Sequence, residues 1–181
     1  MASTYLTRNY SSANQRTFTI SAWVKISNID NFNTIWGAGS NSNNQIILKV
    51  RDSNSLQFYV ETSGSERFNL KTNRLFRDVN GWFHIVLTVD TTQATSSNRA
   101  KIYINGEQET SFSYAVYSSQ NLDLPTASNT ANIGRRLSNS SEYFSGSLSH
   151  FHYIDGTAYD ASYFGSTDAT TGEWKINTSP S

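Results

Sequence analysis

The chain has 181 residues with 14 basic and 14 acidic side chains, so its formal net charge is zero, and it contains no cysteine. This length suits one domain. The lack of cysteine excludes disulfide bonds and thiolate chemistry, and the charge balance argues against nucleic acid or an anionic membrane as partner. Aromatic residues reach 13% and charged residues only 15%, which is typical of a folded domain rather than a disordered segment.

Residues 1–16 lack the apolar stretch of a signal peptide. Elsewhere no apolar run approaches the roughly 18 residues that a membrane-spanning helix needs. We therefore expect a protein that is made in the cytoplasm without a signal peptide and that does not insert into a membrane.

Alternating apolar and polar residues predict strands along most of the chain. In Thr17–Lys25 the apolar residues Phe18, Ile20, Ala22 and Val24 share one face, a period of two that is typical of a strand. The other predicted strands are Thr34–Trp36, Gln45–Val50, Ser55–Glu61, Arg67–Leu70, Trp82–Asp90, Ala100–Asn105, Glu107–Ser113 and Phe144–Asp155.

Turn signals separate these strands. The Asn80-Gly81 and Asn105-Gly106 pairs tolerate positive φ angles, and the second predicts a hairpin. Thr91–Asn98 is small and polar, and predicts a surface loop. The predicted core consists of Phe18, Ile20, Ile85, Leu87, Ile102, Ile104, Leu148 and Phe151.

The strand Phe144–Asp155 changes phase partway along. Leu148 lies on the face of Phe144, but Phe151 and Tyr153 are out of phase with both. One extra residue near Ser149-His150 would return these rings to the core, which predicts a β-bulge there.

The C-terminal residues contain the only helical signal. Asp160–Phe164 predicts one or two turns, with Asp160 as N-cap and Gly165 after the end. The sequence therefore predicts an all-β protein, an antiparallel two-sheet β-sandwich with almost no helix. We expect one domain over residues 1–181, with a tail from about residue 155 that packs on it.

Several segments resemble the laminin G-like, concanavalin A-like jelly-roll family. They are Phe18–Lys25 (FTISAWVK), Gly81–Asp90 (GWFHIVLTVD), Lys101–Gly106 (KIYING), Ile133-Gly134 and Tyr143–Leu148 (YFSGSL). A second set is similar to lectin-like domains in structural proteins of marine tailed phages. This set comprises Thr72–Asp78, Tyr153–Gly165 and Thr170–Lys175. Where the wider family often has an acidic pair after the closing strand, this chain has Ser149 and His150, so the role of that pair is not transferred.

The pattern of acidic residues argues against a glycan-cleaving enzyme. Glucanases of this fold class carry a Glu-x-Asp-x-x-Glu strand, which is absent here. The nearest pattern is Glu107-Gln-Glu109, which a solvated strand face explains better. No Gly-x-Ser-x-Gly segment supports a serine nucleophile. We predict that the protein is not an enzyme.

Metal sites have weak support in the sequence. His150 and His152 are two residues apart and could hold a transition metal, although a polar sheet face explains them better. Asp30, Asn31, Asn33 and Asp90 are candidate calcium ligands because calcium prefers oxygen atoms. Asp and Asn also occur in loops for turn reasons, so no cofactor is predicted and calcium stays an option.

Candidate glycan-binding residues combine aromatic planes with amide and guanidinium groups in loops, where function is often located. They are Asn41, Asn43, Asn44, Tyr114, Tyr117, Arg135, Arg136 and Asn139.

The resemblance implies a phage virion protein on a tail, fibre or capsid surface, whose lectin-like domain binds a glycan or the host cell surface. The alternative is a purely structural decoration or fibre subunit that binds other virion proteins, and a glycoside hydrolase is a remote third. Trp23, on the polar side of its strand, and Trp174, in the tail, suggest a homo-oligomer in which such rings are covered. The competing explanation is that the tail covers Trp23 within one chain.

Overall fold

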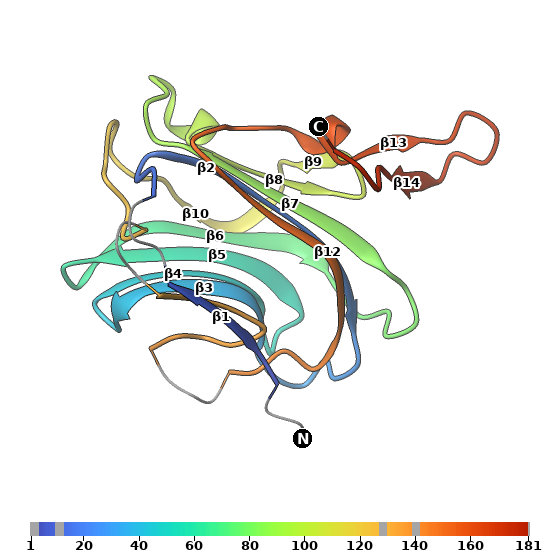
Figure 1. The fold of residues 1–181 in the computed structure, drawn as a ribbon, viewed down its shortest axis with the longest axis horizontal. Coiled ribbons are helices and arrows are strands. Elements are labelled where there is room, and N and C mark those ends of the chain that lie inside the picture. Colours follow the sequence, from blue (N-terminus) through green and yellow to red (C-terminus); the bar gives the residue numbers. More distant parts are fainter. Residues whose placement is uncertain (1–3, 10–12, 127–129, 139–141, 181) are drawn as a thin grey trace.

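The computed structural model describes residues 4–9, 13–126, 130–138 and 142–180. They form two large antiparallel sheets that pack face to face (Figure 1). The seven-stranded sheet contains, in spatial order, β1 (Leu6–Asn9), β11 (Thr130–Ile133), β3 (Asn33–Asn41), β4 (Asn44–Val50), β5 (Ser55–Thr62), β6 (Ser65–Leu75) and β10 (Phe112–Val116). The five-stranded sheet contains β12 (Gly146–Asp155), β2 (Thr17–Ile26), β7 (Phe83–Asp90), β8 (Ala100–Ile104) and β9 (Glu107–Glu109). The predicted all-β sandwich is confirmed.

Helical structure in the described residues is limited to two short 3₁₀ segments, η1 (Ser96–Asn98) and η2 (Ala161–Tyr163). Asp160 caps η2 as predicted, because its Oδ1 accepts a hydrogen bond from the Ser162 amide at 2.9 Å. None of the described segments is a helix long and apolar enough to cross a membrane.

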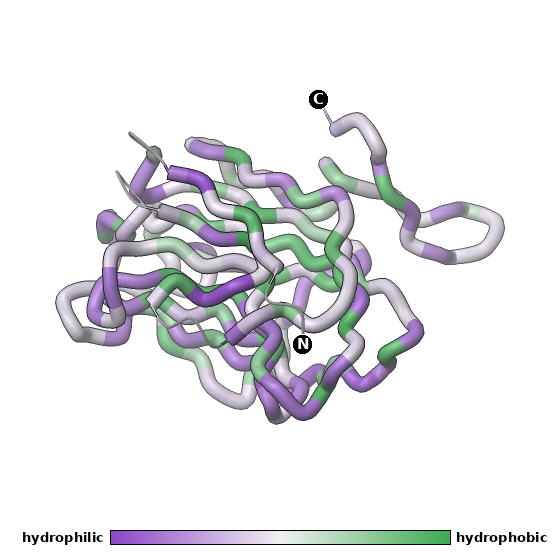
Figure 2. The backbone as a smooth tube through the Cα atoms, turned by 60° about the horizontal axis from the view of Figure 1, so that its bottom comes forward, coloured by the Kyte–Doolittle hydropathy of each residue, from purple (hydrophilic) through white to green (hydrophobic). Residues whose placement is uncertain are grey.

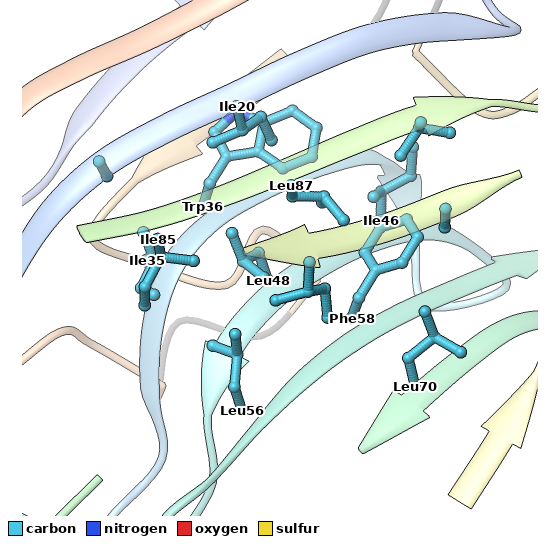
Figure 3. Packing of buried hydrophobic residues seen from close by; sticks show 14 of the residues in the cluster. Ile20, Ile35, Trp36, Ile46, Leu48, Leu56, Phe58, Leu70, Ile85 and Leu87 are labelled. Carbon is cyan, nitrogen blue, oxygen red and sulfur yellow. The ribbon is translucent and has the colours of Figure 1, made fainter. Parts of the chain in front are cut away.

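The core lies between the two sheets, where alternate residues of each strand meet. Figure 2 shows this alternation of apolar and polar residues along the strands. Figure 3 shows the packing at the centre, where Ile46, Leu48 and Phe58 of one sheet meet residues such as Leu87 of the other. Of the eight predicted core residues, Leu148 and Phe151 are only half-buried. The reason is that β12 is an edge strand, so its side chains have neighbours on one side only.

The predicted β-bulge is present in β12. Ser149 pairs with Trp23 and His152 pairs with Ser21, so His150 and Phe151 together oppose one residue of β2. The backbone of His150 has a φ of +46°, which is uncommon for a residue other than glycine. The inserted residue returns Phe151 to the side of the core.

Other boundaries differ from the sequence prediction. The predicted strand Thr34–Trp36 is only the start of β3, because the small residues after Trp36 hide the alternation. The predicted strand Glu107–Ser113 is two strands, β9 and β10, which belong to different sheets. The hairpin at Asn105-Gly106 is confirmed, since β8 pairs with β9.

The C-terminal tail folds over the outer face of the five-stranded sheet. Figure 1 shows this red segment along the outside of β7, β8 and β9, away from the other sheet. It includes the small hairpin of β13 (Gly165–Thr167) and β14 (Trp174–Ile176). Phe164 of the tail is buried against Val86 of β7. The outer face of β2 and β7 is therefore partly covered by the tail.

Three aromatic rings fix the tail to the sheet. His84 of β7 stacks on Trp23 at 5.1 Å between centroids and on Trp174 at 5.9 Å. The β8–β9 turn makes room for the Trp174 ring, because a Cβ on Gly106 would lie 2.3 Å from it. Trp23 and Trp174 are both half-buried within one chain, so the tail already covers part of the two rings from which a homo-oligomer was inferred.

The hydrogen bonds of His84 define its protonation. Trp174 Nε1 donates to His84 Nδ1 at 2.9 Å, and an indole N–H can only donate. Nδ1 therefore carries no proton, and Nε2 donates to Ser21 Oγ at 2.8 Å. Burial, with the nearby His152 as a smaller cause, lowers the pKa of His84 to about 4.

This neutral histidine makes the fold sensitive to mild acid. In the unfolded chain the pKa of His84 returns to about 6.5, so its contribution to stability is complete above pH 6.5 and is lost as the pH falls toward 4. We predict that the free energy of unfolding drops by about 2 kcal/mol between pH 7 and pH 5, above the range where most carboxylates titrate. Urea denaturation at each pH measures it. His84→Phe should flatten this dependence, and an equally steep dependence in that variant would contradict the assignment.

Candidate functional site

Strand alternation places polar side chains on the outer face of the seven-stranded sheet. In β5, Leu56, Phe58 and Val60 point into the core, so Gln57, Tyr59 and Glu61 point outward. The outer polar face, as we name this surface, consists of Gln45, Lys49, Gln57, Tyr59, Glu61, Glu66, Asn69, Lys71 and Tyr114.

A bulge in β6 brings Glu66 to this face. Val60 pairs with Phe68 and Glu61 pairs with Glu66, so Arg67 has no opposite residue in β5. The shift changes the direction of the residues before Arg67. As a result the Glu61 and Glu66 carboxylates are on neighbouring strands and the same side.

A segment between β11 and β12 covers one half of the outer polar face. Residues 134–138 and 142–145 form this crossing segment, which is held together by pairing between Arg135 and Tyr143. It lies directly on β3 at Gly37, where an added Cβ would be 3.5 Å from the Arg135 carbonyl oxygen. Gln45 and Lys49 of β4 are consequently buried although they point away from the core.

Glu142 connects the crossing segment to the sheet. Its Oε2 accepts from Lys49 Nζ at 2.7 Å, and its Oε1 accepts from Arg136 Nη1 at 2.7 Å. Burial alone would raise the pKa of Glu142, but the bonds from these two cations outweigh burial and lower the pKa. Burial also lowers the pKa of Lys49, against the opposing effect of Glu142.

The other half of the outer polar face is open, on β5, β6 and β10. One chain of hydrogen bonds runs from Gln57 Nε2 to Asn69 Oδ1 at 2.8 Å and from Asn69 Nδ2 to Glu66 at 2.5 Å. Another leads to Glu61, which accepts from Gln45 Nε2 at 3.3 Å and from the Tyr59 hydroxyl at 3.0 Å. Both series of hydrogen bonds end on a carboxylate, Glu66 or Glu61, and these bonds fix the positions of the two carboxylates.

Two tyrosine rings lie beside these carboxylates. Tyr114 is 45% exposed, its hydroxyl donates to Glu66 at 3.1 Å, and Lys71 Nζ lies 4.8 Å from its ring centroid. Burial and the bond to Glu61 raise the pKa of Tyr59 to about 12. The open half therefore offers flat rings, carboxylate acceptors and an ammonium donor within a few residues.

The structure places the predicted glycan-binding residues at several locations. Tyr114 lies on the outer polar face, and Arg136 borders it, with Nη2 3.1 Å from Gln45 Oε1. Tyr117 is half-buried against the core. The Arg135 guanidinium lies 3.7 Å from the centroid of the Tyr5 ring. Asn139 is outside the described residues.

The three candidate asparagines lie at the β3–β4 turn. Asn41 Oδ1 accepts from the Asn43 amide at 2.9 Å, and Asn44 Oδ1 accepts from the Ser63 amide at 3.0 Å. The first bond lies within the turn, and the second connects it to the neighbouring β5–β6 turn. They give the side chains a structural role at the edge of the outer polar face.

The candidate calcium ligands do not come together. Asp30, Asn31 and Asn33 follow the end of β2, while Asp90 pairs with Thr17 at its beginning, about 30 Å away along a ten-residue strand. The Asn33 side chain is occupied by Asn28, Asn31 and Ser145 backbone groups. Within the described residues no three acidic or histidine side chains form a metal-binding group.

The remaining candidates also have local partners. Arg74 pairs with Glu109 at 2.9 Å and with Glu107 at 3.7 Å. The His150 Nδ1 atom lies 2.7 Å from Ser149 Oγ, and His152 lies beside Phe164 under the tail. The two histidines remain near each other: burial, with the nearby His150 as a smaller cause, lowers the pKa of His152.

Sequence reasoning missed most of the outer polar face. The sequence predicted the strand Ser55–Glu61, but no binding role was assigned to its outward polar residues. The signal was present, because Gln57, Tyr59 and Glu61 form an unbroken polar side of a strand whose other side is apolar. The contribution of Glu142 was not visible, since it depends on a contact across 93 residues.

A family model described as the concanavalin A-like lectin/glucanases superfamily matches residues 1–161, so the chain belongs to this family. No curated protein sequence matches it. Solved structures with the same fold include a carbohydrate-binding module of a Ruminococcus gnavus sialidase bound to α2,3-sialyllactose, with 13% identity, a TM-score of 0.61, and coverage of 90% of this chain and 96% of that chain.

Two further structures widen the comparison. The SAP-like pentraxin of Limulus polyphemus has 16% identity and a TM-score of 0.59, over 82% of this chain and 68% of that chain. Mouse laminin α1 domains LG4-5 have 9% identity and a TM-score of 0.59, over 98% of this chain and 42% of that chain. At these identities the likeness establishes the fold, which is that of lectin-like domains.

The Glu142 bridge generates a stability prediction. Glu142→Gln keeps the shape of the side chain but leaves the buried Lys49 and the half-buried Arg136 without a counter-charge. We expect a loss of about 3 kcal/mol in the free energy of unfolding, measured with urea. The control is Asp123→Asn, which removes the exposed Arg16 pair and should cost much less, because solvent screens that pair. Equal losses in the two variants would contradict a buried bridge.

Proposed function

We propose that the protein is a non-catalytic glycan-binding module and that the open half of the outer polar face is its binding surface. The observation that carries this proposal is the pair of carboxylates, Glu61 and Glu66, fixed beside the rings of Tyr59 and Tyr114. A pyranose ring has an apolar C–H face and hydroxyl groups around its edge. Tyrosine rings suit the first, and carboxylate and ammonium groups suit the second.

The comparisons support this proposal without identifying the sugar. The relatives named above include a module bound to α2,3-sialyllactose, and another structural neighbour, domain 4 of a Geobacillus stearothermophilus arabinanase, was solved with arabinotriose. We propose further that the module belongs to a tailed-phage virion, on a tail, fibre or capsid surface, where it contacts glycans of the host. This location rests on the resemblance of Thr72–Asp78, Tyr153–Gly165 and Thr170–Lys175 to phage lectin-like domains.

A glycan array with the full chain, followed by calorimetry on the best ligand, tests the binding surface. Tyr114→Ala should weaken binding by about tenfold or more, because a central aromatic contact is lost. Tyr114→Phe should retain most of the affinity if stacking dominates. Tyr5→Ala is the matched control, since it removes a similarly exposed tyrosine near the opposite edge of the sheet. An array without any bound glycan, or full affinity in Tyr114→Ala, would refute the proposal.

The same samples distinguish binding from hydrolysis. A glycosidase needs one carboxyl group that carries a proton and one that does not. Here Glu61 and Glu66 both accept hydrogen bonds from tyrosine hydroxyls and amides, which suits two acceptors. We expect no new reducing ends when bound oligosaccharides are incubated with the protein. Release of product that Glu66→Gln abolishes would show an enzyme instead.

One exposed surface favours the alternative function, that of a structural subunit that binds other virion proteins. Among the described strands, β1 is the last at one edge of the seven-stranded sheet, and its Leu6 side chain is 67% exposed. Exposed apolar edges are common sites of pairing between chains. We propose that the protein forms a homo-oligomer through this edge. Light scattering should then show association that Leu6→Lys removes, and a monomer at every concentration would refute it.

A further inference from the structure

A pocket lies on the side of the molecule opposite to the outer polar face, on the outer face of the five-stranded sheet. It has a volume of about 240 Å³ and is lined by Trp23, Trp82, Ser149, His150 and Ile176, which we name the tryptophan pocket. The lining residues come from β2, β12 and β14 and from the residue before β7. It shares no residue with the outer polar face.

The floor of the tryptophan pocket is one face of the Trp23 ring. On β2, Trp23 has His84 of β7 as one cross-strand neighbour and Ser149 of β12 as the other. His84 stacks on one side of the indole at 5.1 Å. Ser149 is too small to cover the other side. The row of stacked rings Trp174, His84 and Trp23 therefore ends on an indole face toward the pocket.

The walls come from Trp82 and Ile176. Trp82 immediately precedes β7 and is 41% exposed, which is unusual for so large an apolar side chain. Ile176 belongs to β14, two residues after the Trp174 side chain that is bonded to His84. The docked tail thus completes the pocket.

The bulge in β12 places two polar side chains, Ser149 and His150, at the rim of a pocket whose surface is otherwise almost wholly apolar. Ser149 Oγ and His150 Nδ1 are 2.7 Å apart, which leaves Nε2 of His150 without a hydrogen bond among the described residues. The φ of +46° at His150 is backbone strain at the rim of a pocket. Such strained positions and bulges cluster next to binding sites.

The chemistry of the lining selects the ligand class. None of the five lining side chains carries a permanent charge, so a neutral ligand fits better than an ion. The volume is below the roughly 300–1,000 Å³ of pockets for drug-sized molecules, which indicates one ring rather than a chain of rings. An apolar floor with hydrogen-bonding groups on the rim matches a group that is apolar on one face and polar around its edge.

We propose that the tryptophan pocket binds a single pyranose unit of a neutral glycan, stacked on Trp23 and bounded by Trp82. The ring hydroxyls contact Ser149 and His150 at the rim. This site is independent of the outer polar face and would give the domain two binding surfaces on opposite sides.

Indole N–H signals in ¹H–¹⁵N NMR spectra of the full chain provide the test, because the chain has only four tryptophans. The probes are methyl β-D-glucopyranoside, methyl β-D-galactopyranoside and N-acetylglucosamine. At least one should shift the Trp23 and Trp82 signals in a saturable manner and leave Trp36, which is buried in the core, unchanged. Trp82→Ala should weaken this binding by about tenfold.

Two controls separate this site from the proposed function. Tyr114→Ala should leave the titration unchanged, so a failure of the outer polar face does not affect the result. N-acetylphenylalanine amide probes the pocket as a receptor for an apolar side chain. The proposal is overturned if no pyranoside shifts the two indole signals, if Trp82→Ala binds normally, or if the phenylalanine amide binds more tightly than every pyranoside.

Discussion

The bridge from Glu142 to Lys49 and Arg136 is the contact on which the outer surface of the larger sheet depends. A seven-stranded sheet with polar outward residues could be open over its whole width. Here the crossing segment seals the half formed by β3 and β4. One carboxylate, Glu142, bonds both Lys49 of β4 and Arg136 of the same segment. Buried ion pairs contribute little net stability compared with apolar packing, but removing one partner is costly. The bridge therefore serves to position the segment, and it defines where the open half begins.

In each sheet one segment from elsewhere in the chain covers part of the outer face, but the contacts that hold it differ. The crossing segment covers the larger sheet through buried charges, whereas the tail covers the smaller one through stacked rings and the Trp174–His84 hydrogen bond. Each cover is incomplete. On the larger sheet the open remainder is polar, with carboxylates beside tyrosines, and on the smaller sheet it is an aromatic pocket. Loops and tails that lie on a rigid sandwich often carry function in this way.

The sequence was sufficient for features that arise from local pattern. Period-two alternation identified the strands around Phe18 and Ile85, and a phase slip at Ser149-His150 located the bulge. The Asn105-Gly106 turn and the Asp160 cap follow from residue chemistry alone. The candidate site was predicted less well, because it depends on pairing between distant segments. Glu61 and Glu66 share a side only because Arg67 is bulged out, and Asn41, Asn43 and Asn44 looked available until their turn hydrogen bonds were known.

The central claim is that ligand contacts are made on the open half of the outer polar face rather than by the loops at its rim. Backbone amide shifts of the full chain, mapped by NMR during titration with the best glycan from the array, test this claim most directly. We predict that the largest shifts fall on β5, β6 and β10, around Tyr59, Asn69 and Tyr114. Shifts confined to the β3–β4 and β5–β6 turns, around Asn43 and Gly64, would contradict it.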